Sequence, residues 1–397
     1  MATINSYATA AGKRYRVRYR TPDHRQTDKR GFKTKRDAEL FAASVEVSKA
    51  RGEYVNASAS RVTIAELAEP WLKVKEAKLK ASTFRTVQAA WSVYVSPRWG
   101  ATPVGAVRHS DVAEWVAELS AGTAVNSRSP KRRISKAEAK PKSATTVKRA
   151  YGVLASILDG AAKDRRISSN PARGVDNLPS KSPRPRIYLT HAQVGALAEA
   201  AGEYRAVVLT LAYCGLRWGE VAALRVRDVN QVRRRLTVRE NAVMVGRRIV
   251  VGTPKSHEVR EVAYPRLLSS LIDARLQGRA PDALLFEAPT GGYMVRPNTS
   301  ENTTSWYLRA LAAAGLQRMG VHDLRHTAAS LAISAGANPK AVQRMLGHAS
   351  AAMTLDVYAD LFEDDIDTVS DALDQAASLA SVGKTWSDGA DEAAVSA

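Results

Sequence analysis

The stretch from residue 321 to residue 358 collects side chains suited to attack on a phosphodiester. His322 and Arg325 lie three residues apart, and His348 and Tyr358 follow in the same stretch. A phosphodiester gains negative charge on its non-bridging oxygens as it becomes five-coordinate, and a guanidinium offers those oxygens a planar fork of donors that stays charged. A tyrosine hydroxyl, with a free pKa of about 10, is a poor nucleophile unless a base or a strongly positive setting activates it.

Two more cationic side chains lie upstream of this stretch. Arg217 comes shortly after a bend marked by Gly215, in the segment Cys-Gly-Leu-Arg-Trp-Gly-Glu. Lys255 lies in a Thr-Pro-Lys-Ser segment between two strand-like runs, residues 248–251 and 258–263, which predicts a β-turn. From the tip of that turn the lysine could reach a leaving oxygen and protonate it.

Short local signals predict the helices that position these side chains. An apolar-periodic run begins at His322 and predicts a helix with both His322 and Arg325 on one face, ended by Gly336. The Asn-Pro pair at residues 338–339 predicts the cap and first turn of a second helix, and Gly347 predicts its end. The histidine that follows Gly347 would therefore stand at the mouth of the second helix.

These segments resemble a known family. A resemblance to the phage integrase family of tyrosine recombinases covers residues 187–379 and rests on G-L-R-W-G-E, T-P-K, H-D-L-R-H, L-G-H and a tyrosine ten residues later. The resemblance implies that Arg217 and Arg325 hold the scissile phosphate and that Lys255 is the general acid towards the 5′-oxygen. It also implies that His322 and His348 hydrogen-bond the phosphate and assist proton transfer, and that Tyr358 forms a 3′-phosphotyrosine. No cofactor and no metal is implied.

Each of these residues has an ordinary alternative role when taken alone. A single histidine more often caps or packs, a single arginine forms a surface ion pair, a turn lysine is solvated, and a tyrosine packs half-buried. The functional interpretation rests on the order of all five segments together. For Glu220 and Asp323 we expect a helix-cap or ion-pair role, and for His326 packing or capping.

Composition limits the class of protein. The 397-residue chain predicts two or three domains, and its 45% hydrophobic content is ample for their cores. We expect no membrane segment, because no run of about eighteen apolar residues occurs. We expect no secretion, because the first residues show no basic stretch followed by an apolar one. The single cysteine, Cys214, excludes a disulfide framework and a cysteine-based zinc site. A cytoplasmic protein is the expectation.

The net charge of +20 is unevenly distributed. Residues 1–60, 61–186 and 187–350 carry +7, +14 and +9, whereas residues 351–397 carry −10. Every segment before Tyr358 is thus basic, which favours a protein that lies along a phosphate backbone. The alternative, a basic protein without a nucleic-acid partner, is weakened by this order.

Residues 1–56 predict a small α+β module. Residues 13–20 alternate strictly, with tyrosine and valine on one face and arginine on the other. Residues 26–32 can return as a second strand, and residues 35–49 have helical spacing. The module resembles the arm-type DNA-binding domain of some phage integrases, and the candidate DNA contacts are Arg14, Arg16, Arg18 and Arg20. The alternative is an ordinary strand with a solvated arginine face.

Residues 62–168 predict a helical domain. Its expected helices are residues 64–80, 82–95, 111–119 and 143–162, which resemble the core-binding domain of the same family. The basic loop 121–142 has almost nothing to bury, and its candidate phosphate contacts are Lys131, Arg132 and Arg133, although a solvated loop explains them equally well. Residues 169–186, rich in proline and serine, predict an interdomain linker.

Residues 187–381 predict a mainly helical catalytic domain with a small antiparallel sheet near residues 234–264. Residues 361–379 form an amphipathic pattern that could dock on a neighbouring protomer or fold back in cis. Residues 382–397 are expected to be a disordered tail.

The resulting expectation is a multidomain, mainly α protein with small antiparallel sheets: an α+β arm-type module, a helical core-binding domain and a mainly-α catalytic domain. Its expected function is site-specific recombination by a phage or mobile-element integrase in the bacterial cytoplasm, associated with the nucleoid. The expected partners are double-stranded DNA attachment sites and three further copies of the chain, with a DNA-bending host factor and a directionality factor as further candidates, and no membrane. The alternatives are a type IB topoisomerase and a non-catalytic architectural DNA-binding protein.

Overall fold

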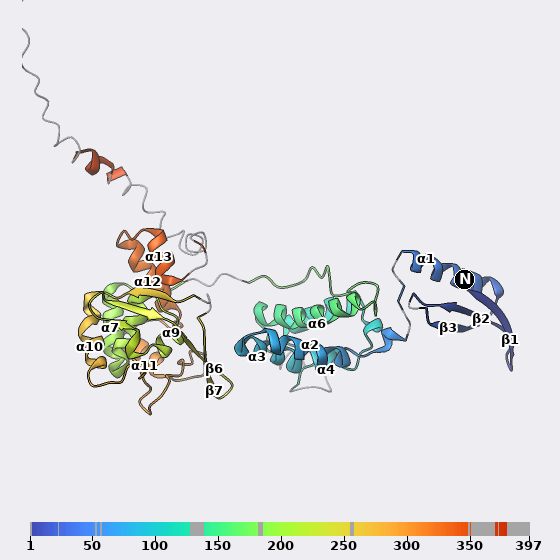
Figure 1. Cartoon of the computed structure of the whole chain (residues 1–397), viewed down its shortest axis with the longest axis horizontal. Helices are drawn as coiled ribbons and strands as arrows, with labels where there is room; N and C mark the ends of the chain where they lie inside the picture. The colour runs from blue at the N-terminus through green and yellow to red at the C-terminus, as the bar shows by residue number, and fades with distance from the viewer. Residues whose placement is uncertain are drawn as a thin grey trace, which may run out of the picture. The chain divides into compact units, whose positions relative to one another are not determined.

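The structure confirms the predicted fold class, mainly helical with small antiparallel sheets. It is a computed structural model that divides into two compact units, residues 1–183 and 184–397 (Figure 1). The residues it describes are 2–22, 24–51, 54–55, 58–127, 139–181, 186–254, 258–347, 350, 370–371 and 373–378. Within these ranges, no helix combines the length and the apolar character that crossing a lipid bilayer requires.

A three-stranded sheet and one helix form the N-terminal module. The antiparallel strands are β1 (Thr3–Thr9), β2 (Gly12–Arg20) and β3 (Gln26–Phe32), and the helix is α1 (Lys35–Ala50). Val17 and Tyr19 of β2 are buried against Ala38 and Val45 of α1, so the predicted alternation is confirmed. The sequence did not predict β1, whose polar and small residues lack a strand pattern and which is held by its pairing with β2.

Helices make up the rest of the first unit. They are α2 (Ile64–Lys78), α3 (Ala81–Ala90), a π-helical turn (Trp91–Val95), α4 (Ser96–Trp99), α5 (His109–Ala121) and α6 (Ala144–Lys163), with 3-10 turns at Ala59–Arg61 and Val104–Ala106. Thr63 caps α2 in a capping box with Glu66. The core is centred on Trp99 and Trp115, whose rings meet edge to face with centroids 5.9 Å apart.

The first part of the predicted linker packs on this helical core. The Asn170 side chain donates to Asp159 Oδ1 at 2.7 Å, and the Asn177 side chain donates to the Ala113 carbonyl at 2.8 Å. Ala172 and Val175 are buried in the core. A segment with these buried contacts is part of the helical domain, and the expectation that the linker begins at residue 169 is corrected accordingly.

The second unit is a helical domain with two small sheets. Its helices are α7 (His191–Ala200), α8 (Arg205–Cys214), α9 (Trp218–Ala223), α10 (Ser269–Leu276), α11 (Trp306–Ala313), α12 (Asp323–Ser334) and α13 (Pro339–Leu346), with 3-10 turns at Gly202–Tyr204, Val226–Asp228 and Arg266–Leu268. Its strands are β4 (Val229–Asn230), β5 (Arg235–Val238), β6 (Asn241–Val245), β7 (Arg248–Gly252) and β8 (Arg260–Ala263). The apolar helix α8 is the centre of the core and packs against both α7 and α12.

The strands that flank Lys255 belong to different sheets. β7 pairs with β6, whereas β8 pairs with β5 in a separate sheet of order β4-β5-β8. The two strand-like runs on either side of Lys255 are therefore strands, as expected, but they do not pair with each other. The turn expected at Lys255 itself lies outside the described residues. The register of a sheet is decided by long-range pairing, which the two strand-like runs alone did not reveal.

The predicted boundaries of the two helices after residue 321 are confirmed. Gly336 and Gly347 have φ values of +76° and +63°, the left-handed conformation that ends a helix. The Asn338 side chain caps α13 by accepting a hydrogen bond from the Lys340 amide at 2.8 Å. The helices α12 and α13 pack on each other through a small cluster that contains Ile333.

Candidate active site

Arg325 binds together two segments that are far apart in the sequence. Its side chain is 2% exposed and donates from Nη1 to the Gly215 carbonyl at 2.5 Å and from Nη2 to the Leu346 carbonyl. Gly215 has a φ of +62°, and a Cβ there would lie 2.7 Å from the Leu346 side chain. The C-terminal ends of α8 and α13 can therefore approach each other only with glycine at this position.

Arg217 stands at the start of α9 and is held by Glu220. Its Nη1 donates to Glu220 Oε1 at 2.8 Å, and Arg260 of β8 donates to the same carboxylate at 2.7 and 3.1 Å. The Glu220 side chain is fully buried, which alone would raise its pKa, but the hydrogen bonds from Arg260 and Arg217 lower the pKa below its ordinary value. The expected ion-pair role of Glu220 is confirmed, and Arg217 is positioned by a charged carboxylate.

Arg260 extends this network towards α13. Its Nε donates to the Met345 carbonyl at 3.4 Å, and a Cβ at Gly347 would lie 2.9 Å from the same nitrogen. Sequence analysis did not single out Arg260, because its partner Glu220 lies forty residues away and no local spacing joins them. The structure thus links Arg217 to the chain that leads into His348.

His322 lies at the N-terminal end of α12, and its ring is packed edge to face on His326 with centroids 5.1 Å apart. The packing role expected for His326 is confirmed. Burial lowers the pKa of His322 to about 4, helped by the nearby His326, Arg325, Arg296 and Arg217. The imidazole is therefore neutral at neutral pH, with one nitrogen that can donate and one that can accept.

We expect the buried, neutral His322 to make stability depend on pH. The unfolded chain takes up a proton at the ordinary histidine pKa of 6.5, whereas the folded chain does so only near 4. The stabilising effect is thus complete above pH 6.5 and is lost as the pH falls towards 4. Urea unfolding midpoints measured across this window should fall less steeply for His322→Gln than for the wild type. Equal slopes would contradict the assignment of a depressed pKa to His322.

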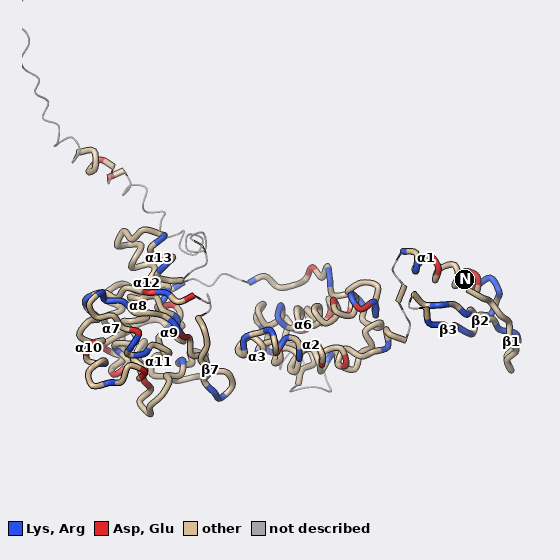
Figure 2. The backbone as a smooth tube through the Cα atoms, in the orientation of Figure 1, with Lys and Arg blue, Asp and Glu red and all other residues tan. Residues whose placement is uncertain are grey.

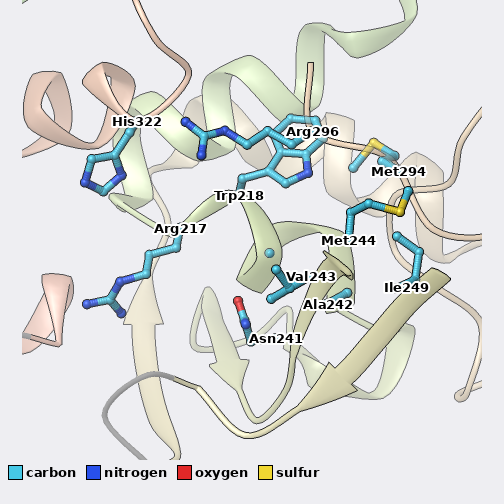
Figure 3. A pocket seen from close by; sticks show the side chains of 11 residues that line it. Arg217, Trp218, Asn241, Ala242, Val243, Met244, Ile249, Met294, Arg296 and His322 are labelled. Atoms are coloured by element: carbon cyan, nitrogen blue, oxygen red, sulfur yellow. The ribbon is translucent and has the colours of Figure 1, made fainter. Parts of the chain in front are cut away.

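A cavity of about 390 Å³ opens beside these groups (Figure 3). One edge carries Arg217, His322 and Arg296, and the apolar wall includes Trp218 and Met244. The wall is formed where β6 packs against the start of α9, and a Cβ at Gly219 would lie 2.6 Å from the Ala242 carbonyl. The absence of a side chain at Gly219 therefore lets α9 and β6 meet closely and form a continuous wall of the cavity.

The structure brings together Arg217, His322 and Arg325 from two of the five segments, and the charges of both arginines act on His322. Asp323, for which a cap or ion-pair role was expected, accepts a hydrogen bond from the Gly320 amide at 2.7 Å at the start of α12. Other predicted site residues lie outside the described part of the chain: Lys255, His348, Tyr358, and Lys131, Arg132 and Arg133 of the basic loop. Arg14, Arg16, Arg18 and Arg20 lie on β2, on the face turned away from the buried Val17.

Comparison with known families gives two matches on separate parts of the chain. Residues 188–364 match the phage integrase family, and residues 7–49 match an arm DNA-binding domain. The integrase of Mycobacterium phage D29 is 27% identical over 343 residues, which cover 82% of this chain and 84% of that protein. Tyrosine recombinase XerC 2 of Ralstonia nicotianae is 32% identical over 236 residues, which cover 56% of this chain and 64% of that protein.

Solved structures show the same fold. The Tn1549 transposon integrase in complex with transposon right end DNA superposes with a TM-score of 0.61 at 19% identity, covering 78% of this chain and 100% of that one. A lambda integrase tetramer bound to a Holliday junction has a TM-score of 0.52 at 16% identity, covering 87% of this chain and 96% of that one. Together, these findings show that residues 188–364 form a domain of the phage integrase family and that an arm DNA-binding domain precedes it, in a chain similar to known integrases.

Proposed function

We propose that this recombinase cleaves and rejoins DNA strands at attachment sites through a 3′-phosphotyrosine formed by Tyr358, and so integrates or excises a mobile element. The observation that carries the proposal is the convergence of Arg217 and Arg325 on His322, with Arg325 hydrogen-bonded to the Leu346 carbonyl at the C-terminal end of α13. His348 follows that end directly in the chain, and Tyr358 comes ten residues later. The proposed roles of Lys255, His348 and Tyr358 rest on the order of the family segments.

The proposed reaction exchanges one phosphoester for another. The Tyr358 oxygen attacks the scissile phosphorus and passes its proton to His348. The bond from phosphorus to the 5′-oxygen breaks, and Lys255 gives that oxygen a proton. Rejoining reverses these steps with a 5′-hydroxyl from the partner strand. Because the phosphotyrosine bond conserves the energy of the broken ester, no nucleotide cofactor enters the balance.

The cationic groups would stabilise the five-coordinate phosphorus. Arg217 is rigidly placed by Glu220, and a preorganised donor of this kind contributes roughly a hundredfold to a thousandfold in rate. Neutral His322 can donate a hydrogen bond to a non-bridging oxygen without adding another full charge. Arg325 would contact the phosphate from the floor of the site, because its side chain is only 2% exposed. The same guanidinium also holds the main chain at Gly215 and Leu346 by hydrogen bonds.

The proposed partners are two duplex attachment sites and three further copies of the chain, acting as a tetramer on DNA. The lambda integrase tetramer on a Holliday junction supports this stoichiometry by analogy of fold. A DNA-bending host factor and a directionality factor are further proposed partners, and the proposed place of action is the nucleoid in the bacterial cytoplasm. A type IB topoisomerase and a non-catalytic architectural protein are not favoured, given integrase relatives and an arm-domain match.

Covalent trapping tests the proposal. The full-length protein is incubated with a nicked duplex suicide substrate that carries its crossover sequence, and the denatured products are examined for protein linked to DNA. A linked species mapped to Tyr358 is expected. A site that the protein binds but to which it never becomes linked would instead support an architectural role.

The arm sheet provides a separate prediction about binding. Arg16 lies centrally on β2, on the face opposite α1, and is directly opposite Arg30 of β3; Figure 2 shows the lysines and arginines on these strands. We expect Arg16→Gln to weaken binding to one class of site, lowering the slope of log affinity against log salt by about 0.9, the value for one phosphate. Cleavage at the crossover site should be unchanged.

The matched control for this prediction is Arg36→Gln, which removes the same charge from the exposed first turn of α1 on the other side of the sheet. Binding is measured by titration of labelled arm-site and crossover-site duplexes at several salt concentrations. If Arg16→Gln and Arg36→Gln lower the salt slope equally, the strand face does not make the proposed contact.

A further inference from the structure

Arg296 lies on the edge of the cavity beside Arg217 and His322, although no family segment includes it. In Figure 3 its side chain extends along the same edge of the cavity as His322. It comes from the segment between α10 and α11, whose approach to the cavity was not apparent from the sequence. The position of Arg296 is therefore a product of the tertiary structure.

The segment that carries Arg296 is anchored on both sides. Met294 and Pro297 are buried, whereas Arg296 between them is exposed. Further along, the Arg318 guanidinium donates to the Thr299 carbonyl at 3.3 Å. A side chain presented from a fixed backbone loses less conformational entropy when it binds a ligand, so Arg296 is well placed to bind one.

Among the described residues, no carboxylate pairs with Arg296. Several other arginines of this unit pair with carboxylates, namely Arg205, Arg217, Arg225, Arg227, Arg239, Arg260 and Arg279. Within the described ranges, Arg296 makes neither an ion pair nor a hydrogen bond, and its charge contributes to lowering the pKa of His322. A cation held next to other cations is destabilising by itself, so an arriving anion would be bound favourably.

We propose that Arg296 binds a phosphate of the DNA backbone next to the scissile phosphate, and that the adjoining apolar wall accommodates the sugar of that nucleotide. The guanidinium fork suits a phosphate, and the wall formed by Trp218 and Met244 offers apolar contact to deoxyribose carbons. The contact fixes the register of the strand, so that the scissile phosphate lies between Arg217 and His322. The inference rests on the proposed recombination reaction and adds a DNA-positioning residue to it.

Three variants test the contact. Arg296→Gln removes the charge, Arg296→Lys keeps the charge without the fork, and Arg233→Gln removes the same charge from the exposed turn between β4 and β5, away from the cavity. Equilibrium binding to the crossover-site duplex is measured from about 50 mM to about 200 mM salt. Formation of the covalent complex is measured in a single turnover on the suicide substrate, with thermal unfolding as a check on folding.

We expect Arg296→Gln to lower the salt slope of crossover-site binding by about 0.9 and to slow covalent-complex formation about ten- to a hundredfold, the loss of one charge-assisted hydrogen bond. Arg296→Lys should restore the salt slope but only part of the rate, and Arg233→Gln should match the wild type in both. Equal values for Arg296→Gln and Arg233→Gln would overturn the inference. Absence of a covalent complex with the wild-type protein would instead contradict the proposed reaction itself.

Discussion

Replacing Tyr358 with phenylalanine should abolish the covalent attachment of the protein to DNA and leave DNA binding unchanged. The substitution removes one hydroxyl and keeps the ring, so the only group lost is the proposed nucleophile. No other group of the proposed site can form the same ester with the 3′-phosphate in its place. The measurement is the yield of protein–DNA adduct on a suicide substrate, together with the dissociation constant for the same duplex.

A second tyrosine supplies the matched control. Tyr204 is stacked on Trp306 with centroids 4.0 Å apart, so Tyr204→Phe also removes a hydroxyl from the catalytic unit while keeping the ring in place. This variant should form the adduct as the wild type does. If Tyr358→Phe loses DNA binding as well as attachment, Tyr358 has a structural role; if it still forms the adduct, another residue is the nucleophile.

Replacing Arg217 with alanine should reduce the rate of DNA cleavage by roughly a hundredfold to a thousandfold, the value of one preorganised donor to a developing negative charge. The fold should tolerate the change. Arg217 has a side-chain exposure of 24%, and its partner Glu220 keeps both hydrogen bonds from Arg260 after the substitution. The buried carboxylate is therefore not left without a counter-charge, which is the situation that destabilises proteins strongly.

Single-turnover cleavage on the suicide substrate and urea unfolding separate these two effects. Arg217→Lys keeps a charge but not the fork of donors, so it should recover only part of the rate. A small effect of Arg217→Ala on cleavage would remove Arg217 from the phosphate site. Arg325 offers no equally clear test, because its guanidinium also bonds the Gly215 and Leu346 carbonyls and its loss would leave buried acceptors unpaired.

Local signals in the sequence determined the elements that position the site. Gly336 and Gly347 end helices because glycine adopts the left-handed backbone conformation without strain. Asn338 caps α13 with its side chain. The burial of one face of β2 also followed from alternation, and residues 26–32, expected to return as a strand, form β3. Such signals act within a few residues and are complete in the sequence, so they can be interpreted without the fold.

Long-range contacts decided the rest. Glu220 bridges Arg217 and Arg260, which lie on segments far apart in the sequence. Arg325 is likewise buried against the carbonyl of a distant residue, Gly215. Arg296 lies beside His322 although the two are separated by more than twenty residues. The pairing of β7 with β6 and the packing of residues 170–177 on the helical core are of the same kind. The sequence by itself thus determined which residue types are available for phosphoryl transfer and where helices begin and end. Only the tertiary structure decided which charged side chains are paired, which are buried and which are exposed where they could bind DNA. The reason is that burial and Coulomb energy depend on distances in space and not on spacing along the chain.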